Sequence, residues 1–153
     1  MAKNKLTRGI RNNNPFNIKR SQVAWYGEVP AINGRSDKLF EQFYSMEFGY
    51  RAGIKLLYNY HRNGLTTVRG IIGRFAPVSE NDTLSYIDFV SSKLSCGKDR
   101  EIVCLNDFLL LCKYICKYES QVNVMPDYLI KVIDKHLPYV KNYFTASKSD
   151  ECR

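Results

Sequence analysis

Residues 106–120, NDFLLLCKYICKYES, form the most apolar segment of the chain. Four apolar side chains and one carboxylate recur there at helical spacing: Phe108, Leu111, Cys112, Ile115 and Glu119. Side chains three, four and seven residues apart share one face of an α-helix. Asn106 is a typical N-cap residue. The segment therefore predicts a helix that begins near Asn106 and buries this face in the core.

The residues before this segment are also helical in pattern. In residues 47–64, side chains at helical spacing share one helix face, and the segment ends at Gly64. This face consists of Phe48, Ala52, Leu56 and Tyr60. Gly49 and Gly53 lie four residues apart, so they would permit a close approach of another segment.

Three further helices are expected along the chain. Residues 66–77 predict a helix capped by Thr67, and residues 79–94 predict one that starts near Asp82 or Thr83. The second of these should turn Leu84, Ile87 and Leu94 inward. Residues 125–138 predict the last helix, with proline near its start and after its end.

Residues 15–46 differ from the rest because aromatic and β-branched residues alternate there with turn residues. This mixture predicts short strands and turns, with residues 38–45, KLFEQFYS, as one strand. The expected fold is mainly α (α+β), a single domain over residues 1–153 with a small N-terminal β/loop region. Residues 1–10 and 142–153 are expected to fray.

The net charge of +8 favours a polyanionic partner, which includes nucleic acid, an anionic membrane surface and the cell wall. No apolar run reaches the roughly 18–20 residues of a membrane span, and the N-terminus lacks the apolar stretch of a secretory signal. We therefore expect a protein made in the cytoplasm without a signal peptide. The five cysteines contain no CxxC pair, so we expect mostly buried, reduced thiols and neither a metal nor a cofactor.

Glu119 is the first candidate for catalysis because it shares the apolar face of its helix near the C-terminal end. Apolar surroundings and the negative end of the helix dipole both raise the pKa of a carboxyl group. A general acid for glycosidic cleavage needs such a raised pKa. The alternative is an exposed glutamate at a helix end, or one paired with a lysine or arginine.

Two other segments carry candidate binding residues. Asparagines and aromatic side chains together suit a carbohydrate cleft, and they gather at Asn13, Asn14, Asn17, Trp25 and Tyr26. Residues 74–86 place Glu80, Asp82 and Tyr86 at a helix entrance. The alternatives are a turn-rich aromatic mini-core for the first segment and simple helix capping for the second.

Known nucleotide-binding, hydrolase and metalloprotease motifs are absent. Basic residues alternate with aromatic ones in KYICKY, residues 113–118, so nucleic-acid binding stays open as a third interpretation.

Four motifs together resemble a group of phage-borne and prophage-borne proteins described as virion structural proteins or peptidoglycan hydrolases. They are RGIRNNNPFNIK (8–19), WYG (25–27), FEQFYS with the helix after it, and IIGRFAPVSENDTLSYIDFV (71–90). This resemblance implies bacterial peptidoglycan as substrate, a virion particle as a further partner, and action on the wall after lysis or virion delivery.

The chain is also similar to bacterial glucosaminidases of the lysozyme superfamily. Those enzymes carry NNLFGIK, WxG, an aromatic FRxYxS strand and a YAxDPxY-like element. Here the matching residues are NNPFNIK (13–19), WYG (25–27), Phe43-Tyr44-Ser45 and the segment from Phe75 to Tyr86. The resemblance implies a lysozyme-like helical fold and cleft roles for Tyr44 and Tyr86.

The order of the motifs departs from that family, whose catalytic glutamate lies in an ES motif before the NNLFGIK segment. Here KYICKYES (113–120) matches the ES motif on the C-terminal side, with Gln121 in place of the usual glycine. The resemblance thus implies a circularly permuted lysozyme-like domain with Glu119 as its acid. If the hypothesis is right, Glu119 should face Tyr86 and residues 12–19.

The expected function is cleavage of peptidoglycan glycan strands, by a glycosidase or a lytic transglycosylase. Hydrolysis needs a second carboxylate, for which the candidates are Glu28, Asp37, Glu80 and Asp82, with Glu80 chosen first. The alternative is a non-catalytic virion structural or cell-wall-binding protein on the same fold, ranked above a nucleic-acid-binding module. The cleaved bond, the second carboxylate, the oligomeric state and a phage or host origin stay open.

Overall fold

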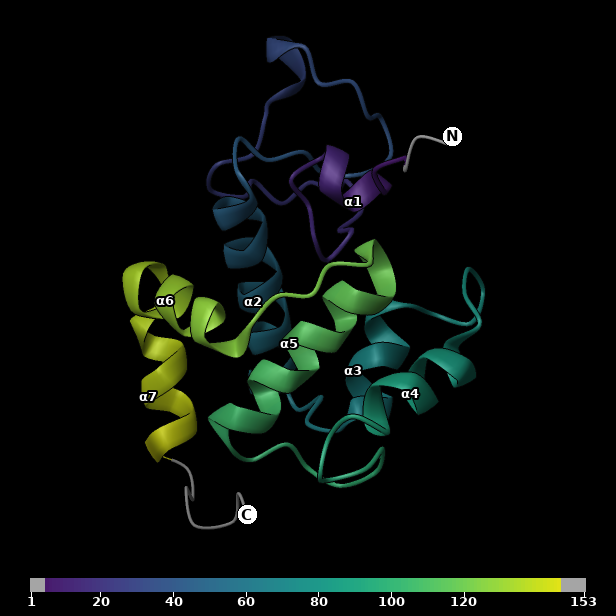
Figure 1. Ribbon diagram of the computed structural model, residues 1–153, viewed down its shortest axis with the longest axis vertical. Helices are drawn as coiled ribbons and strands as arrows, with labels where there is room; N and C mark the ends of the chain where they lie inside the picture. The colour runs from purple at the N-terminus through teal and green to yellow at the C-terminus, as the bar shows by residue number, and fades with distance from the viewer. Residues whose placement is uncertain (1–4, 147–153) are drawn as a thin grey trace.

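The computed structural model describes residues 5–146, and its chain is mainly α-helical (Figure 1). The helices in order are α1 (Arg8–Arg11), α2 (Met46–Arg62), α3 (Val68–Phe75), α4 (Thr83–Ser91), α5 (Leu105–Ser120), α6 (Pro126–His136) and α7 (Pro138–Ala146). A short 3-10 helix, Ala31–Asn33, interrupts the long connection between α1 and α2.

The helix α5 occupies the centre of the fold. Figure 1 shows α3 and α4 on one side of it, α6 and α7 on the other, and α2 crossing behind. It contacts α1, α2, α4, α6 and α7. Its residues Phe108, Leu111, Cys112 and Ile115 are fully buried, so the prediction that this face lies in the core is confirmed.

Most predicted helix starts are confirmed, but two local predictions are wrong. The side chains of Thr67 and Asp82 cap α3 and α4 as expected. However, α5 begins two residues earlier than predicted, because the cap is Cys104 and not Asn106. Leu84 points outward, since the buried stripe of α4 is Thr83, Tyr86, Ile87 and Val90.

The C-terminal segment is more ordered than expected. Residues 142–146 belong to α7, which is held by the buried side chains of Val140 and Phe144. At the other end, Thr7 caps α1 and residues 8–11 are helical. The remaining residues predicted to fray, 1–4 and 147–153, lie outside the described part of the chain.

The predicted β region is not found among residues 5–146. Only isolated bridges occur, including Lys19 with Phe40 and Glu28 with Phe43. Residues 38–45 form no strand, because their backbone amides bond to scattered partners; those of Glu41 and Tyr44, for example, donate to the carbonyls of Ile18 and Gly27. The Asp37 carboxylate accepts from Leu39 and Phe40, and the amide of Phe43 donates to the Asn12 carbonyl. The fold is therefore all-α with a long N-terminal loop region.

Glycines bring this loop region close to the helices. A Cβ on Gly49 would lie 2.0 Å from the Asn13 carbonyl oxygen, and one on Gly53 would lie 1.9 Å from the Phe16 ring. A Cβ on Gly9 would lie 1.7 Å from Ser120 Oγ at the end of α5. Glycine at these positions therefore permits the approach of the loop to α2 and of α1 to α5.

The thiols of Cys96, Cys112 and Cys116 are free, as predicted, and the last two are fully buried. Cys104 departs from that prediction because it is disulfide-bonded. Within residues 5–146, no helix combines the length and hydrophobicity that crossing a bilayer requires.

Candidate functional site

A cavity of about 280 Å³ lies between the N-terminal loop region, α2, the α3–α4 connection and the end of α5. Two acidic side chains, Glu119 and Glu80, line it together with Asn17, Lys19 and Trp25. Leu56, Tyr60 and Phe75 supply apolar and aromatic wall. Segments that are far apart in the sequence therefore converge on one concave site that combines polar and aromatic groups.

Glu119 lies in the last turn of α5 and contacts the Asn-rich loop. The Asn17 side-chain amide donates to Glu119 Oε1 at 3.4 Å. Burial raises the pKa of Glu119, and this rise is opposed by Tyr86, Asn17 and the positive charge of Lys19. The carboxyl group therefore holds its proton to higher pH than an exposed glutamate.

Tyr86 faces Glu119 from α4. Its side chain is fully buried and its ring stacks on Tyr118, with centroids 3.8 Å apart. Burial and the neighbouring Glu119 raise the pKa of Tyr86. The hydroxyl lies against the carboxylate, but it makes no well-formed hydrogen bond to any described group. Tyr86 does not line the cavity, so it contacts Glu119 from within the core.

The end of α5 is fixed by the first described residues. The Thr7 hydroxyl donates to the Ser120 carbonyl oxygen at 2.8 Å, and Gly9 packs against the Ser120 side chain. Gln121 then ends the helix in the left-handed conformation, with φ 58°. The backbone around Glu119 is thus held from both the N-terminal segment and the helix cap.

The predicted asparagines have different roles. Asn14 is fully buried and clamps its own loop, donating to the carbonyls of Ile18 and Glu41 and accepting from the Ile18 amide. Asn13 donates to the Phe43 carbonyl. Asn17 is the one of the three that lines the cavity, and its Oδ1 is buried without a described partner.

Asn13 and Asn17 both adopt positive φ, at 51° and 54°. Asparagine tolerates this left-handed region better than other non-glycine residues. The loop conformation thus explains two of the asparagines, and the cavity adds a second reason for Asn17 alone.

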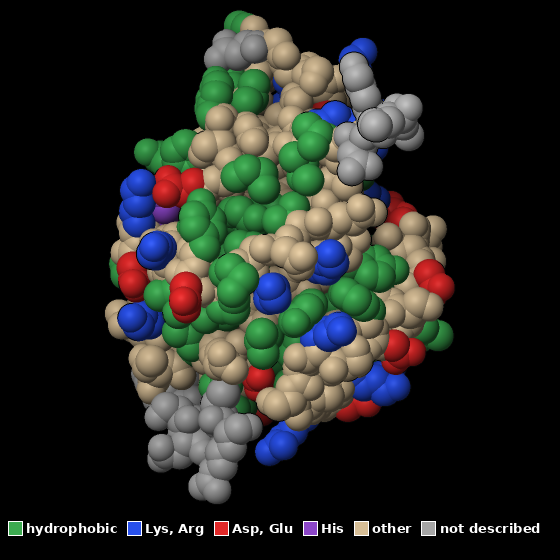
Figure 2. Space-filling view, in the orientation of Figure 1, with side chains coloured by type: hydrophobic (Ala, Val, Ile, Leu, Met, Phe, Trp, Pro, Cys, Tyr) green, Lys and Arg blue, Asp and Glu red, His purple; other side chains and the backbone are tan. Residues whose placement is uncertain are grey.

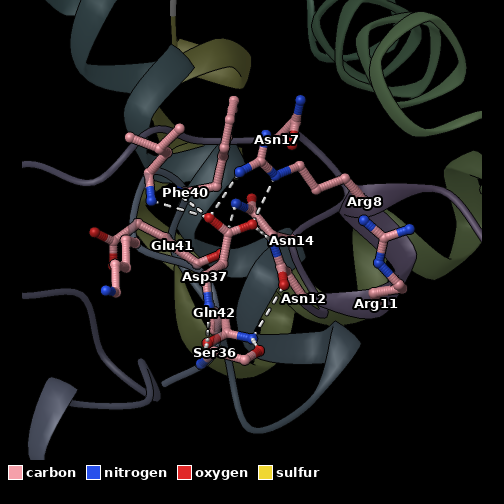
Figure 3. A network of polar contacts seen from close by, with 12 residues as sticks. Arg8, Arg11, Asn12, Asn14, Asn17, Ser36, Asp37, Phe40, Glu41 and Gln42 are labelled. Atoms are coloured by element: carbon pink, nitrogen blue, oxygen red, sulfur yellow. Dashed lines mark hydrogen bonds and ion pairs between the residues drawn. The ribbon is translucent and has the colours of Figure 1, made fainter. Parts of the chain in front are cut away.

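Asp37 holds the outer side of this loop and lines a different cavity from the one that contains Glu119. Figure 3 shows its carboxylate between Arg8 and Asn12. Arg8 Nε and Nη2 donate to it at 2.6 and 2.9 Å, and Asn12 donates at 2.9 Å. These hydrogen bonds, led by that of Arg8, hold the pKa of Asp37 well below its usual range. Its candidacy as a second carboxylate is therefore wrong.

Glu28 is also directed elsewhere. Arg35 Nη2 lies 3.5 Å from Glu28 Oε2 and 3.3 Å from Glu41 Oε2, in a cluster away from the cavity lining. Burial, followed by the neighbouring Glu28, raises the pKa of Glu41 to about 7. This cluster was not predicted, because charged residues at irregular spacing carry no pattern.

The predicted aromatic residues differ in whether they line the cavity. Trp25 is 8% exposed, lines the cavity, and its indole N–H has no described partner. Tyr26 is 63% exposed and lines a second, adjoining cavity. Tyr44 is 57% exposed and lines neither.

Of the two acidic candidates near the start of α4, the structure brings Glu80 alone to the cavity. Its carboxylate forms an ion pair with Lys19, and both side chains are about half exposed. Asp82 is absent from the lining and accepts hydrogen bonds from Ser85 as the cap of α4. The capping interpretation therefore accounts for Asp82. Sequence reasoning missed Lys19 because one lysine in a basic chain gives no signal.

Charge on the visible face is mixed. Figure 2 shows Lys and Arg interleaved with Asp and Glu, and hydrophobic side chains across the middle. This face carries no continuous positive track of the kind that follows a phosphate backbone. Among residues 5–146, no three His, Cys, Asp or Glu side chains gather as metal ligands would.

No protein-family model matches the chain. Over 103 residues it is 40% identical to a protein named Protein P5 from Pseudoalteromonas phage PM2. The match covers 65% of this chain and 62% of Protein P5, so the chain spans less than two thirds of that relative's length. The chain is therefore similar in sequence to a phage protein, as one of the two resemblances implied.

Proposed function

We propose that this protein cleaves the glycan strands of bacterial peptidoglycan, with Glu119 as the general acid. The observation that carries the proposal is that Glu119 and Asn17, 102 residues apart, contact each other and line one cavity, while the buried Tyr86 lies against Glu119 without lining it. This is the arrangement that the resemblance to permuted lysozyme-like glucosaminidases required.

The environment of Glu119 suits protonation of a glycosidic oxygen. Cleavage of this bond needs a carboxylic acid that is still protonated near the working pH, and burial shifts the pKa of Glu119 in that direction. Asn17 donates to the carboxylate and the Tyr86 hydroxyl lies against it, which restricts the direction in which the proton can be presented.

The wall of the cavity suits a sugar. Tyr60, Phe75 and Trp25 supply the apolar and aromatic surface that stacks on sugar faces. Asn17 Oδ1 and Trp25 Nε1 are a buried acceptor and a buried donor without described partners. Sugar hydroxyl and acetamido groups would satisfy both, and such bonds give recognition because an unpaired buried group is costly.

Glu80 is the candidate second carboxylate. It lines the same cavity and is held by Lys19. In a hydrolase it would act as base or as stabiliser of the charge on the sugar. In a lytic transglycosylase Glu119 would serve first as acid and then as base, and Glu80 would be dispensable for the chemistry.

Purified peptidoglycan tests the proposal and separates these two reactions. Wild type should release muropeptides, and Glu119→Gln should lose about 10²–10⁴-fold in rate, the usual contribution of a general acid. Glu101→Gln is the matched control, because Glu101 is exposed and outside the cavity lining. Full activity of Glu119→Gln, with normal folding by circular dichroism, would refute the assignment.

The products and the Glu80→Gln variant identify the reaction. Reducing-end products that disappear in Glu80→Gln indicate hydrolysis with two carboxylates. Anhydro-sugar products that persist in Glu80→Gln indicate transglycosylation. Binding to peptidoglycan without any released product would instead favour the non-catalytic wall-binding or virion structural role. The similarity to Protein P5 supports a phage setting for either role.

A further inference from the structure

A second cavity, of about 270 Å³, adjoins the first. The two share three lining residues, Val23, Trp25 and Leu56. Trp25 thus stands between them, with its buried indole N–H lacking a described partner. A ligand long enough to pass Trp25 would occupy both cavities and offer this N–H an acceptor.

The second cavity is basic. Arg51, Lys55 and Asn59 lie four residues apart along α2 and all line it. Residues at this spacing share one helix face. Neither Arg51 nor Lys55 forms an ion pair with any residue in 5–146, and no acidic residue lines this cavity. Its two cations are therefore available to an anionic ligand.

Tyr26 completes the second cavity with an exposed aromatic ring. The Arg51 guanidinium lies over this ring, 5.1 Å from its centre. The ring also makes an edge contact with Phe48. Arg51 is thus held by a cation–π contact and not by an ion pair with a carboxylate of residues 5–146.

The two cavities differ in charge, and this difference selects the ligand. The first contains the carboxyl group of Glu119 and the Glu80–Lys19 ion pair, so it offers an anionic ligand no unpaired cation. The charged side chains of the second cavity are both cationic, Arg51 and Lys55. A ligand that spans both should place a neutral sugar in the first cavity and carboxylates in the second. In peptidoglycan this combination is a glycan strand with its peptide stems attached.

We propose that the Arg51–Lys55 cavity binds the carboxylates of the peptide stem, so that the substrate is peptide-bearing glycan and not bare glycan. This inference rests on the proposed function for its ligand class. It assigns to α2 a binding role that the sequence analysis did not include.

Calorimetric titration tests the inference without requiring cleavage. The two probes are a disaccharide muropeptide that carries a tetrapeptide and the same disaccharide with its lactyl carboxyl group converted to a simple amide, which carries no carboxylate. Wild type should bind the muropeptide about tenfold or more tightly, since two cations meet its carboxylates at a partly buried site. In the double variant Arg51→Gln, Lys55→Gln this preference should fall to about twofold or less. Higher salt should reduce the preference of wild type and leave that of the variant unchanged.

The matched control is the double variant Lys93→Gln, Lys131→Gln, which removes the same charge from exposed positions outside both cavities. It should keep the wild-type preference. Equal affinity of wild type for the two probes, or equal losses in the two double variants, would overturn the inference. The inference would also be overturned if the double variant Arg51→Gln, Lys55→Gln lost binding of a single-stranded oligonucleotide but bound the muropeptide as wild type does. That result would assign the cavity to nucleic acid.

Failure of the inference is distinguishable from failure of the proposed function. If wild type prefers the muropeptide but releases no product from peptidoglycan, cleavage fails and the peptide site stands. If wild type cleaves peptidoglycan but binds both probes equally, the peptide site fails and the proposed function stands.

Discussion

Replacement of Asp37 by Asn should destabilise the protein strongly although Asp37 lies outside the candidate site. Its two oxygens accept five hydrogen bonds, from Arg8 Nε and Nη2, Asn12 Nδ2 and the amides of Leu39 and Phe40. An Asn amide nitrogen at Oδ2 would meet two donors, and at Oδ1 it would meet three. Either orientation leaves donors unpaired and removes the charge that Arg8 faces.

The size of the effect follows from burial. A hydrogen bond to a charged group contributes about 1.5–3 kcal/mol, and breaking a buried pair costs about 3–5 kcal/mol. The Asp37 side chain is 10% exposed but that of Arg8 is 40% exposed, so water compensates part of the loss. We expect the free energy of unfolding to fall by about 3 kcal/mol, measured by urea denaturation at neutral pH.

Asp99 provides the matched control. Arg69 Nε and Nη2 donate to it at 2.6 and 3.2 Å, nearly the same geometry, but the Asp99 side chain is 65% exposed. Asp99→Asn should therefore change the stability far less than Asp37→Asn. Because the pKa of Asp37 is lowered in the folded state, its stabilisation is present above the ordinary carboxyl pKa and is lost as pH falls. Equal losses in the two variants would refute the reasoning.

Three further outcomes are expected. Gly53→Ala should lower stability by about 1–3 kcal/mol in thermal unfolding, because its Cβ would enter the Phe16 ring. Gly73→Ala, with open space around its Cβ, should be neutral or stabilising by up to about 1 kcal/mol, and similar losses in both would contradict the packing argument. Because the pKa of Glu41 is raised to about 7 in the folded state, its protonated form adds stability that is complete below the unfolded carboxyl pKa and is lost as pH rises through 7, by up to about 3 kcal/mol. Glu41→Gln should flatten this part of the pH–stability profile. An unchanged profile would exclude Glu41 as its source. Tyr86→Phe removes a group that lowers the pKa of Glu119, so an NMR titration of the Glu119 carboxyl carbon should show a higher pKa, and no change would mean that the hydroxyl does not contact it.

The helical part of the fold was predictable because its signals are local. Thr67 and Asp82 cap their helices through their own side chains, and the apolar face of α5 repeats at helical spacing. Leu84 was misplaced because the buried stripe of α4 starts at the neighbouring Thr83. The helix α7 was missed because its buried face consists of few residues, chiefly Val140 and Phe144.

The loop region was not predictable from alternation alone. Its aromatic residues alternate as in strands, but side chains such as Gln42 and Asp37 take the amides that a β-ladder would use. The site was predictable in part, because Glu119 shares the core face and the motifs pointed to Tyr86 and Asn17. Asn14 was assigned to substrate because an amide that clamps backbone groups has the same chemistry as one that binds a sugar.

The hydrogen bond between Thr7 and Ser120 has a consequence for the order in which the protein folds. The two partners are 113 residues apart, and Asn17 and Glu119 are 102 apart. Contacts of such long sequence separation form late in folding because a large loop must close first. During synthesis the loop around Asn17 leaves the ribosome long before the end of α5 exists. We therefore expect the pocket around Glu119 to be completed late in folding, after the helices that surround it have formed.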